Sequence, residues 1–178
     1  GVDAQRTGVR VGHQRHVDPG ADRGTEGVLH PDRGAAEPDR ESEALRERYL
    51  PGIIAGETLI ASAISEPNAG SDISSIRTRA LLVGDRYIVN GQKVWSSAGD
   101  VADLLVVAVA CGKDARGRSV IGRLLIDKRE SKVSTRVLPM LGMKRHAMCE
   151  IFFEDCAVPA GNMIGKPGDG DEALALSW

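Results

Sequence analysis

A nine-residue stretch, ISEPNAGSD at positions 64–72, sets the tightest limit on how this chain can fold. Pro67 fixes its own φ and pushes Glu66 into an extended conformation, so no helix can run through this point. Gly70 tolerates a left-handed φ, which favours a turn. The stretch therefore predicts a tight turn, with the carboxylate of Asp72 placed to cap whatever element follows.

The same turn also has the composition of an anion site. A Gly followed by a Ser, as in Gly70-Ser71, can bring backbone N–H groups and a hydroxyl close to a phosphate. A capped turn that binds no ligand explains the same residues equally well. The stretch by itself leaves both interpretations open.

Composition excludes several classes of partner. The 178 residues are enough for one domain of ordinary size with a sizeable core. A net charge of −2 gives no electrostatic case for nucleic acid or an anionic membrane, and 3% aromatic residues argue against a base-stacking surface. The longest apolar run, Leu104–Cys111, is far too short to cross a bilayer, and no secretory signal opens the chain. We therefore expect a cytoplasmic protein with no nucleic-acid partner and no membrane partner.

Potential metal ligands and thiols point to no metal site. Three cysteines lie in apolar, strand-like runs: Cys111, Cys149 and Cys156. Buried, reduced thiols explain them better than a zinc or redox motif, because none has a close partner. His13, His16 and Asp18 have metal-like spacing, but chance in a His-rich tract is favoured, since nothing nearby would hold them rigidly.

Residues 1–40 differ in character from the rest of the chain. They contain seven Gly, six Arg and three of the four His, but no Ile, Met, Phe, Tyr, Trp or Lys. No helical or strand period runs through them. Such a segment cannot bury enough apolar surface to offset the entropy of ordering it, so we expect it to be disordered and open to proteases.

Short helices are expected on either side of a middle region. Residues 41–50 are rich in helix formers, and Pro51-Gly52 is expected to end that helix. The tail, GKPGDGDEALALSW at 165–178, carries acidic residues where a second helix would begin.

The middle region is rich in short strands. They are expected at 78–83, 86–89, 92–97, 104–111, 120–127, 133–138 and 150–153. Asn90-Gly91 is the strongest short signal for a hairpin, so it is expected to turn the chain between two of these strands. The spacing of the strands predicts a mainly β domain, either a sandwich or a barrel.

Two segments of this region resemble the acyl-CoA dehydrogenase family. ISEPNAGSD is similar to the family's T-E-P-x-A-G-S-D, and NGQKVWSS at 90–97 is similar to N-G-Q-K-x-W-[IS]-[TS]. The run LGMKRHAMCEIFFEDCAVPAGNMIG at 141–165 resembles the family's last β-segments and their Val-Pro exit. The resemblance covers Ser62 to about Ala160 and implies the β-barrel or sandwich of the family's middle domain.

The resemblance also implies a domain organisation. Residues 1–40 match no part of the family's N-terminal helical domain, and 41–61 resemble its end. Residues 62–160 correspond to the middle β-domain, and 161–178 to the start of the C-terminal helical domain. The sequence starts at Gly1 and holds no more of that last domain, so we expect a truncated fragment that is inactive alone.

The chemistry implied by the resemblance is FAD-dependent α,β-dehydrogenation of an acyl-CoA thioester, an oxidoreductase reaction of fatty acid and lipid metabolism. In the family a carboxylate removes the α-proton and the β-hydride passes to flavin N5, while the protein binds and orients the cofactor. Matching positions imply these cofactor-binding residues: Ile64, Ser65, Gly70, Ser71, Trp95, Ser96 and Ser97. Ser71 also corresponds to a residue that meets the pantetheine arm of the substrate.

The roles implied for these residues differ. Ser65 stands where the family's hydroxyl bonds the flavin ring, Trp95 where a ring lies against the isoalloxazine, and Ser97 where a hydroxyl meets N5. Strand alternation would put Trp95 and Ser97 on one face, with Ser96 contributing only backbone. If the resemblance is set aside, a Trp in a strand is most often a core residue, and the serines would most often be hydroxyls of turns or of sheet edges.

Two departures from the family limit what is implied. Ser65 and Ser97 replace the commoner Thr, which keeps the hydroxyl but loses a methyl that restricts χ1. The family's catalytic Glu lies in its C-terminal domain, and no residue here matches it. We therefore expect no catalytic residue in this chain, and Glu66 is given no catalytic role.

The complete parent is expected to use an acyl-CoA substrate, to pass electrons to electron-transferring flavoprotein and to form a homo-oligomer. One alternative is an acyl-CoA oxidase or flavin monooxygenase relative of the same fold, which reaction of the flavin with oxygen would distinguish. Another is a non-catalytic β-module, which would show no flavin absorbance band.

Overall fold

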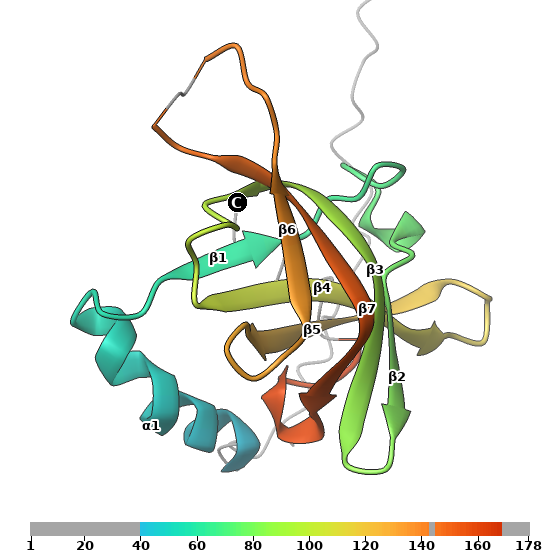
Figure 1. Cartoon of the computed structure of the whole chain (residues 1–178). Helices are drawn as coiled ribbons and strands as arrows, with labels where there is room; N and C mark the ends of the chain where they lie inside the picture. Colours follow the sequence, from blue (N-terminus) through green and yellow to red (C-terminus); the bar gives the residue numbers. More distant parts are fainter. Residues whose placement is uncertain (1–39, 143–144, 169–178) are drawn as a thin grey trace, which may run out of the picture. The chain divides into compact units, whose positions relative to one another are not determined.

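The computed structural model describes residues 40–142 and 145–168 (Figure 1). Arg40 begins the helix α1. The rest of the N-terminal segment, which was expected to be disordered, lies outside these ranges. Most of the expected tail helix lies outside them too. The helical elements are α1 (Arg40–Ile54) and two 3-10 helices, η1 (Ile73–Ser75) and η2 (Ala160–Asn162). The strands are β1 (Ile60–Ala63), β2 (Arg79–Val83), β3 (Arg86–Ser97), β4 (Leu104–Lys113), β5 (Ser119–Asp127), β6 (Val133–Val137), β7 (Met148–Pro159) and β8 (Met163–Ile164).

The eight strands form one open sheet in the order β6-β7-β3-β2-β4-β5-β8, with β1 also beside β4. One edge of β4 is shared by two parallel neighbours. It pairs with β1 along Leu104–Val107 and with β2 only at Ala110. The sheet bends at this shared edge, and Figure 1 shows β4 and β5 crossing behind β3 and β7. The mainly β fold predicted from the strand spacing is confirmed.

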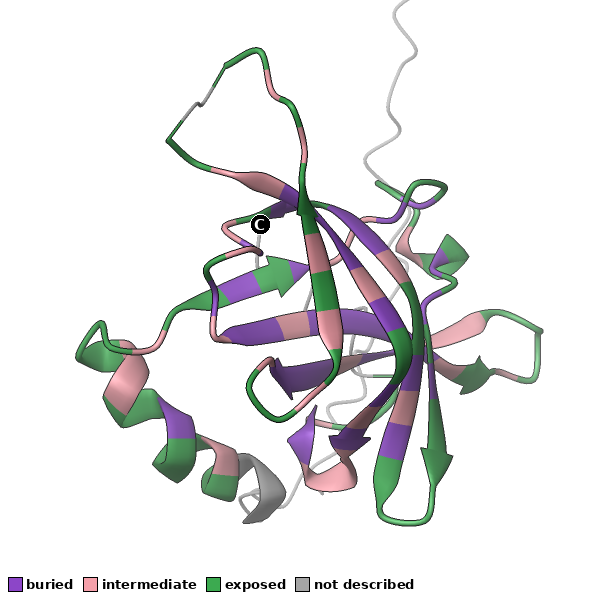
Figure 2. Cartoon of the chain, in the orientation of Figure 1, coloured by how far each residue is buried: buried purple, intermediate pink, exposed green. Residues whose placement is uncertain are grey.

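The main core lies between the two halves of the bent sheet. Its buried apolar side chains come from both halves and include Val89, Leu105, Val107, Leu124, Ile126, Ile151, Phe153 and Val158. Figure 2 shows buried residues concentrated on β3, β4, β5 and β7. A separate cluster of Tyr49, Leu104 and Leu125 packs α1 against β4 and β5. The bend therefore lets one sheet cover its own apolar face, as the two layers of a sandwich do.

The expected end of α1 at Pro51-Gly52 is wrong. The helix continues through Pro51 to Ile54, and Gly56, at φ 73°, closes it with a bond from its N–H to the Ile53 carbonyl (3.1 Å). Proline removes a hydrogen bond from a helix interior and is unfavourable there. Ile53 packs against the cluster that holds the helix, so tertiary packing outweighs the local signal.

The expected hairpin at Asn90-Gly91 is also wrong. β3 runs unbroken from Arg86 to Ser97, and the pair lies at a bulge where its register with β7 shifts. The Asn90 side chain makes two hydrogen bonds to Asp155 of β7. It accepts one from the Asp155 N–H (2.9 Å) and donates one to the Asp155 carboxylate (3.1 Å). Asp155 has a left-handed φ of 46°. The same residue types that favour turns also favour bulges, and here the long-range partner decides between them.

Gly91 is required at this bulge for a second reason. Its φ is 151°, and a Cβ there would lie 2.6 Å from the Thr78 Cα. Thr78 is itself buried just before β2, so it has no room to move away. The absence of a side chain is what allows β3 to pass this close to the neighbouring backbone.

The three cysteines are free, with Cys149 and Cys156 buried and Cys111 half-buried. Burial raises the pKa of the Cys156 thiol to about 11 and also raises the pKa of the other two. His13, His16 and Asp18 lie outside the described residues, within which no group of His, Cys, Asp and Glu is arranged to hold a metal ion. In the described ranges, no helix has the length and apolarity needed to span a membrane.

The close approach at Gly91 gives a test of the bulge. Gly112 has nearly the same φ (154°) but open space where its Cβ would be, so it is a matched control. Both Gly→Ala changes strain the backbone, but only Gly91→Ala adds a clash, and we expect it to cost about 1–3 kcal/mol more than Gly112→Ala. Urea unfolding of both variants measures the difference. Equal losses would mean that the approach to Thr78 does not constrain the fold.

Candidate functional site

A cavity of about 670 Å³ lies between the loop that follows β1 and the end of β3. It is lined by Ser62, Ile64, Ser65, Gly70, Ser71, Ile73, Val94, Trp95 and Ser97. Six of the seven residues expected to bind a cofactor are therefore brought together. The exception is Ser96, which is buried.

The ISEPNAGSD stretch forms the tight turn that its sequence predicts. Glu66 and Ala69 exchange backbone hydrogen bonds of 2.7 and 3.1 Å across it. Asp72 then caps η1, accepting from the Ser74 N–H at 3.1 Å. Among the described residues no partner occupies the hydroxyl of Ser65, which therefore remains available at the cavity wall.

The turn is held against β3 by a buried ion pair. Lys93 is fully buried, and its ammonium donates to the Glu66 carboxylate (2.9 Å) and to the Ile64 carbonyl (2.9 Å). Glu66 also accepts from the backbone N–H groups of Arg77 (2.7 Å) and Thr78 (2.8 Å). The two bonds from Lys93 join the turn to β3, and the two from Arg77 and Thr78 join it to the segment just before β2. The pair therefore holds in place the turn whose neighbouring residues line the cavity.

This arrangement sets the protonation states of Lys93 and Glu66. Burial lowers the pKa of Lys93 to about 8, against the opposing effect of its bond to Glu66. Burial acts to raise the pKa of Glu66, but the bonds from Lys93 and Thr78 outweigh it, so the pKa lies below its usual value. Both groups are charged at pH 7. Ionised Glu66 stabilises the fold there, and this stabilisation is lost as the pH falls through its lowered pKa.

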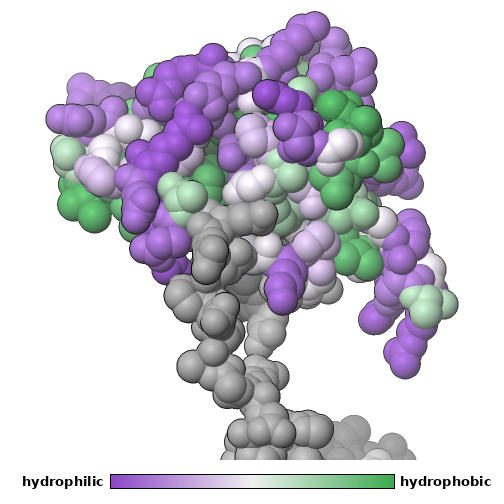
Figure 3. Space-filling view, turned by 90° about the horizontal axis from the view of Figure 1, so that it is seen from below, coloured by the Kyte–Doolittle hydropathy of each residue, from purple (hydrophilic) through white to green (hydrophobic). Residues whose placement is uncertain are grey.

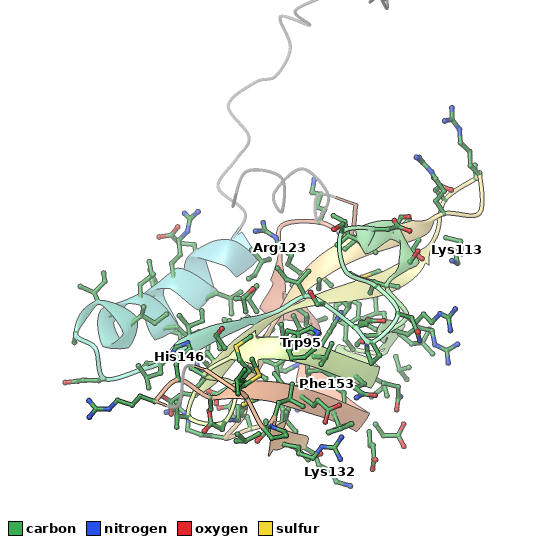
Figure 4. All side chains as sticks on the ribbon, turned by 90° about the horizontal axis from the view of Figure 1, so that it is seen from above. Trp95, Lys113, Arg123, Lys132, His146 and Phe153 are labelled. Carbon is green, nitrogen blue, oxygen red and sulfur yellow. The ribbon has the colours of Figure 1, made fainter. Side chains whose placement is uncertain are left out.

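The end of β3 carries Trp95 in an unusual backbone conformation. Its φ is 61°, and the register with β7 shifts between Lys93 and Ser96. A left-handed φ is a genuine outlier for a bulky residue, and such strain is characteristic of functional sites. Trp95 is 56% exposed and lines the cavity. Figure 4 labels its side chain. Trp95 is therefore not the core residue that its place in a strand would suggest.

Ser96 and Ser97 point in different directions. The Ser96 hydroxyl donates to the Ser62 carbonyl (2.7 Å) and ties β3 to β1. Ser97 is exposed at the cavity, and among the residues that the structure describes its hydroxyl contacts only the weak acceptor Sδ of Met148 (3.2 Å). The prediction that Trp95 and Ser97 face the same way matches the geometry, although a bulge rather than plain alternation produces it.

Sequence reasoning missed part of this site. It gave no role to Lys93 or Glu66, although two opposite charges at positions where a strand and a turn should be buried are a signal for such a pair. It also did not anticipate β1, which supplies Ser62. The described residues that line the cavity carry hydroxyl and apolar groups but no ionisable side chain, so this lining suits a neutral ring better than a charged one.

Comparison with known proteins identifies this arrangement. The family model for the middle domain of acyl-CoA dehydrogenases matches residues 61–156, which is more than half of the chain. The chain belongs to the acyl-CoA dehydrogenase family. The matched region contains both segments that build the cavity.

Individual relatives agree with this assignment. The mitochondrial isovaleryl-CoA dehydrogenase of Pongo abelii is 42% identical over 134 residues, covering 72% of this chain and 31% of the relative. An acyl-CoA dehydrogenase from Geobacillus kaustophilus has a TM-score of 0.70 at 37% identity, covering 75% of this chain and 36% of that one. A prolyl acyl carrier protein oxidase has a TM-score of 0.67 at 32% identity, covering 74% and 35%. The chain thus spans about a third of the length of these acyl-CoA dehydrogenase relatives.

The ion pair gives a test of how the cavity is built. Lys93→Met leaves a buried carboxylate without its counter-charge, so we expect a loss of about 3–5 kcal/mol of unfolding free energy. The double variant Lys93→Met/Glu66→Gln removes both charges and should recover part of that loss. Arg118→Met, which removes the exposed pair with Asp114, should change stability little. Urea unfolding compares the three, and a double variant no more stable than Lys93→Met would refute the pairing.

Proposed function

We propose that this chain is the flavin-binding middle part of an FAD-dependent acyl-CoA dehydrogenase, which oxidises the α,β CH–CH bond of acyl-CoA thioesters. The observation that carries the proposal is the cavity itself. An exposed indole on β3 and the hydroxyls of Ser65, Ser71 and Ser97, from two segments that are separate in the sequence, meet at its wall.

The cavity suits the flavin of FAD in size and chemistry. Its volume of about 670 Å³ lies within the range of small-molecule sites. The exposed face of Trp95 offers an aromatic plane on which a ring system can stack. Ser65 and Ser97 would donate hydrogen bonds to the polar edge of that ring, and Ile64 would pack beside it.

The turn would hold the rest of the ligands. Gly70 has open space where a side chain would be, so a cofactor phosphate can approach its backbone. Ser71 would meet that phosphate and the pantetheine arm of the acyl-CoA. Ser96 would contribute only its backbone, because its hydroxyl already bonds the Ser62 carbonyl.

Bound FAD would accept the hydride from the β-carbon; the residues of this chain would orient it and keep water from one face. None of the described residues that line the cavity is a carboxylate. Glu66 is not available as a base, because both of its oxygens accept hydrogen bonds from Lys93, Arg77 and Thr78. We therefore infer that the base that removes the α-proton comes from a part of the protein outside these residues.

In the complete protein, 41–61 would end an N-terminal helical domain, 62–160 form the middle domain and 161–178 begin a C-terminal helical domain. That protein would act in fatty acid metabolism in the cytoplasm, assemble as a homo-oligomer and pass electrons to electron-transferring flavoprotein. An oxidase is the second candidate, because a structure 32% identical to this chain is an acyl carrier protein oxidase. Rapid reoxidation of the reduced flavin by oxygen in the complete protein would favour the oxidase.

Flavin titration of single variants tests the assigned residues. Trp95→Ala should weaken FAD binding through lost stacking of about 0.5–1.5 kcal/mol beyond the area term. Ser97→Ala should cost about 1 kcal/mol of binding for one hydrogen bond. Ser96→Ala is the matched control. We expect it to lower the stability of the fold and to leave FAD affinity unchanged. Circular dichroism checks folding, and equal affinities for all three variants would contradict the assignment.

A second expectation concerns catalysis by the isolated chain. Without a base, it should not reduce an artificial electron acceptor with any acyl-CoA above a no-enzyme control, because general acid–base catalysis alone contributes about 10²–10⁴-fold. An assay in the presence of added FAD measures this. Turnover would show that one of the residues in this chain acts as the base.

A further inference from the structure

The hydroxyl of Ser97 is held by the side chain of Met148. The strand β3 begins in the hairpin with β2, on the side of the molecule where Figure 3 shows hydrophobic surface, and it ends at the cavity with Ser97. There the Ser97 hydroxyl donates to Sδ of Met148 at 3.2 Å. Met148 is the first residue of β7 and lies directly opposite Ser97 in the register of the two strands. The contact therefore joins cross-strand neighbours, whose Cβ atoms lie side by side.

Hydrogen bonds fix the backbone that carries Met148. Its carbonyl accepts from the Leu138 N–H at 2.7 Å, and the carbonyl of Ala147 accepts from the Ala98 N–H at 2.9 Å. The Met148 side chain is itself half-buried. The sulfur is therefore attached to a backbone that cannot slide past Ser97.

Ser97 needs such a neighbour, because a serine restricts its own χ1 little. The torsion has three staggered positions, and a β-branched residue such as threonine is much stiffer there. Ser97 is exposed, so packing does not select one of these positions. A hydroxyl that samples all three would place its oxygen correctly for a ligand only part of the time.

We propose that Met148 is a positioning residue, whose sulfur selects the χ1 position in which the Ser97 hydroxyl meets the flavin. The inference rests on the proposed function, since the ring has to bind at this wall. A thioether sulfur is a weak acceptor, so the proton can turn from the sulfur to a stronger acceptor on the ring while the oxygen stays in place. Met148 is not among the described residues that line the cavity, so its effect on the ring passes through Ser97.

The χ1 populations of Ser97 can be measured by NMR on the full 178-residue chain without any cofactor. We expect the Hα–Hβ scalar couplings of Ser97 to show one dominant rotamer. In Met148→Leu, which nearly keeps the apolar volume but removes the sulfur, they should be averaged. Ser96 is the internal control, because its hydroxyl bonds the Ser62 carbonyl at 2.7 Å and its couplings should stay those of one rotamer. Averaged couplings at Ser97 before the substitution, or the same single rotamer after it, would overturn the proposal.

FAD titration then connects the rotamer to binding. If the competent position falls from the dominant one to one of three, the apparent affinity falls about threefold. Met148→Leu should therefore raise the FAD dissociation constant about threefold, but should leave it unchanged in a Ser97→Ala background. Adding Ser97→Thr to Met148→Leu should restore the affinity, because the methyl group of threonine restricts χ1. An equal loss with and without the Ser97 hydroxyl, or a loss that threonine does not repair, refutes the positioning role.

The two measurements separate this inference from the proposed function. If the chain does not bind FAD, the proposed function fails and the role of Met148 towards the flavin fails with it. If FAD binding is weakened by Trp95→Ala but not by Met148→Leu, the proposed function stands and the inference about Met148 alone is overturned.

Discussion

The buried contact between Lys93 and Glu66 is the interaction on which the candidate site depends. Removing two charges from water is expensive, and the cost is offset only when hydrogen bonds satisfy both groups. Here the carboxylate receives bonds from Lys93, Arg77 and Thr78, and the ammonium also binds the Ile64 carbonyl. The pair therefore links the turn, the segment just before β2, and β3 at a single point.

The second constraint is the shared edge of β4. Because β1 and β2 both lie beside it, one sheet can bend and bury its apolar face without a second sheet. The same bend brings the loop after β1 over the end of β3, where the cavity forms.

One strained backbone position lies at the wall of the cavity. Trp95 has a left-handed φ that costs free energy for a large side chain, and the surrounding ion pair and the Ser96–Ser62 bond hold it in place. The result is an exposed indole at the cavity wall instead of another core residue. In the proposed function this strain has a role, because the flavin would need a flat partner that is accessible before it binds.

The sequence by itself determined the turn at Glu66–Gly70, the series of strands and the family, because these depend on local backbone limits and on residue spacing. Local sequence signals predicted the wrong conformation where contacts with residues distant in the sequence determine it. Asn90-Gly91 forms a bulge because Asp155 and Thr78 lie against it, and Pro51 stays in a helix because Ile53 is packed. The Lys93–Glu66 pair and the exposure of Trp95 likewise required the tertiary structure, since burial and strain are set by neighbours far apart in the chain.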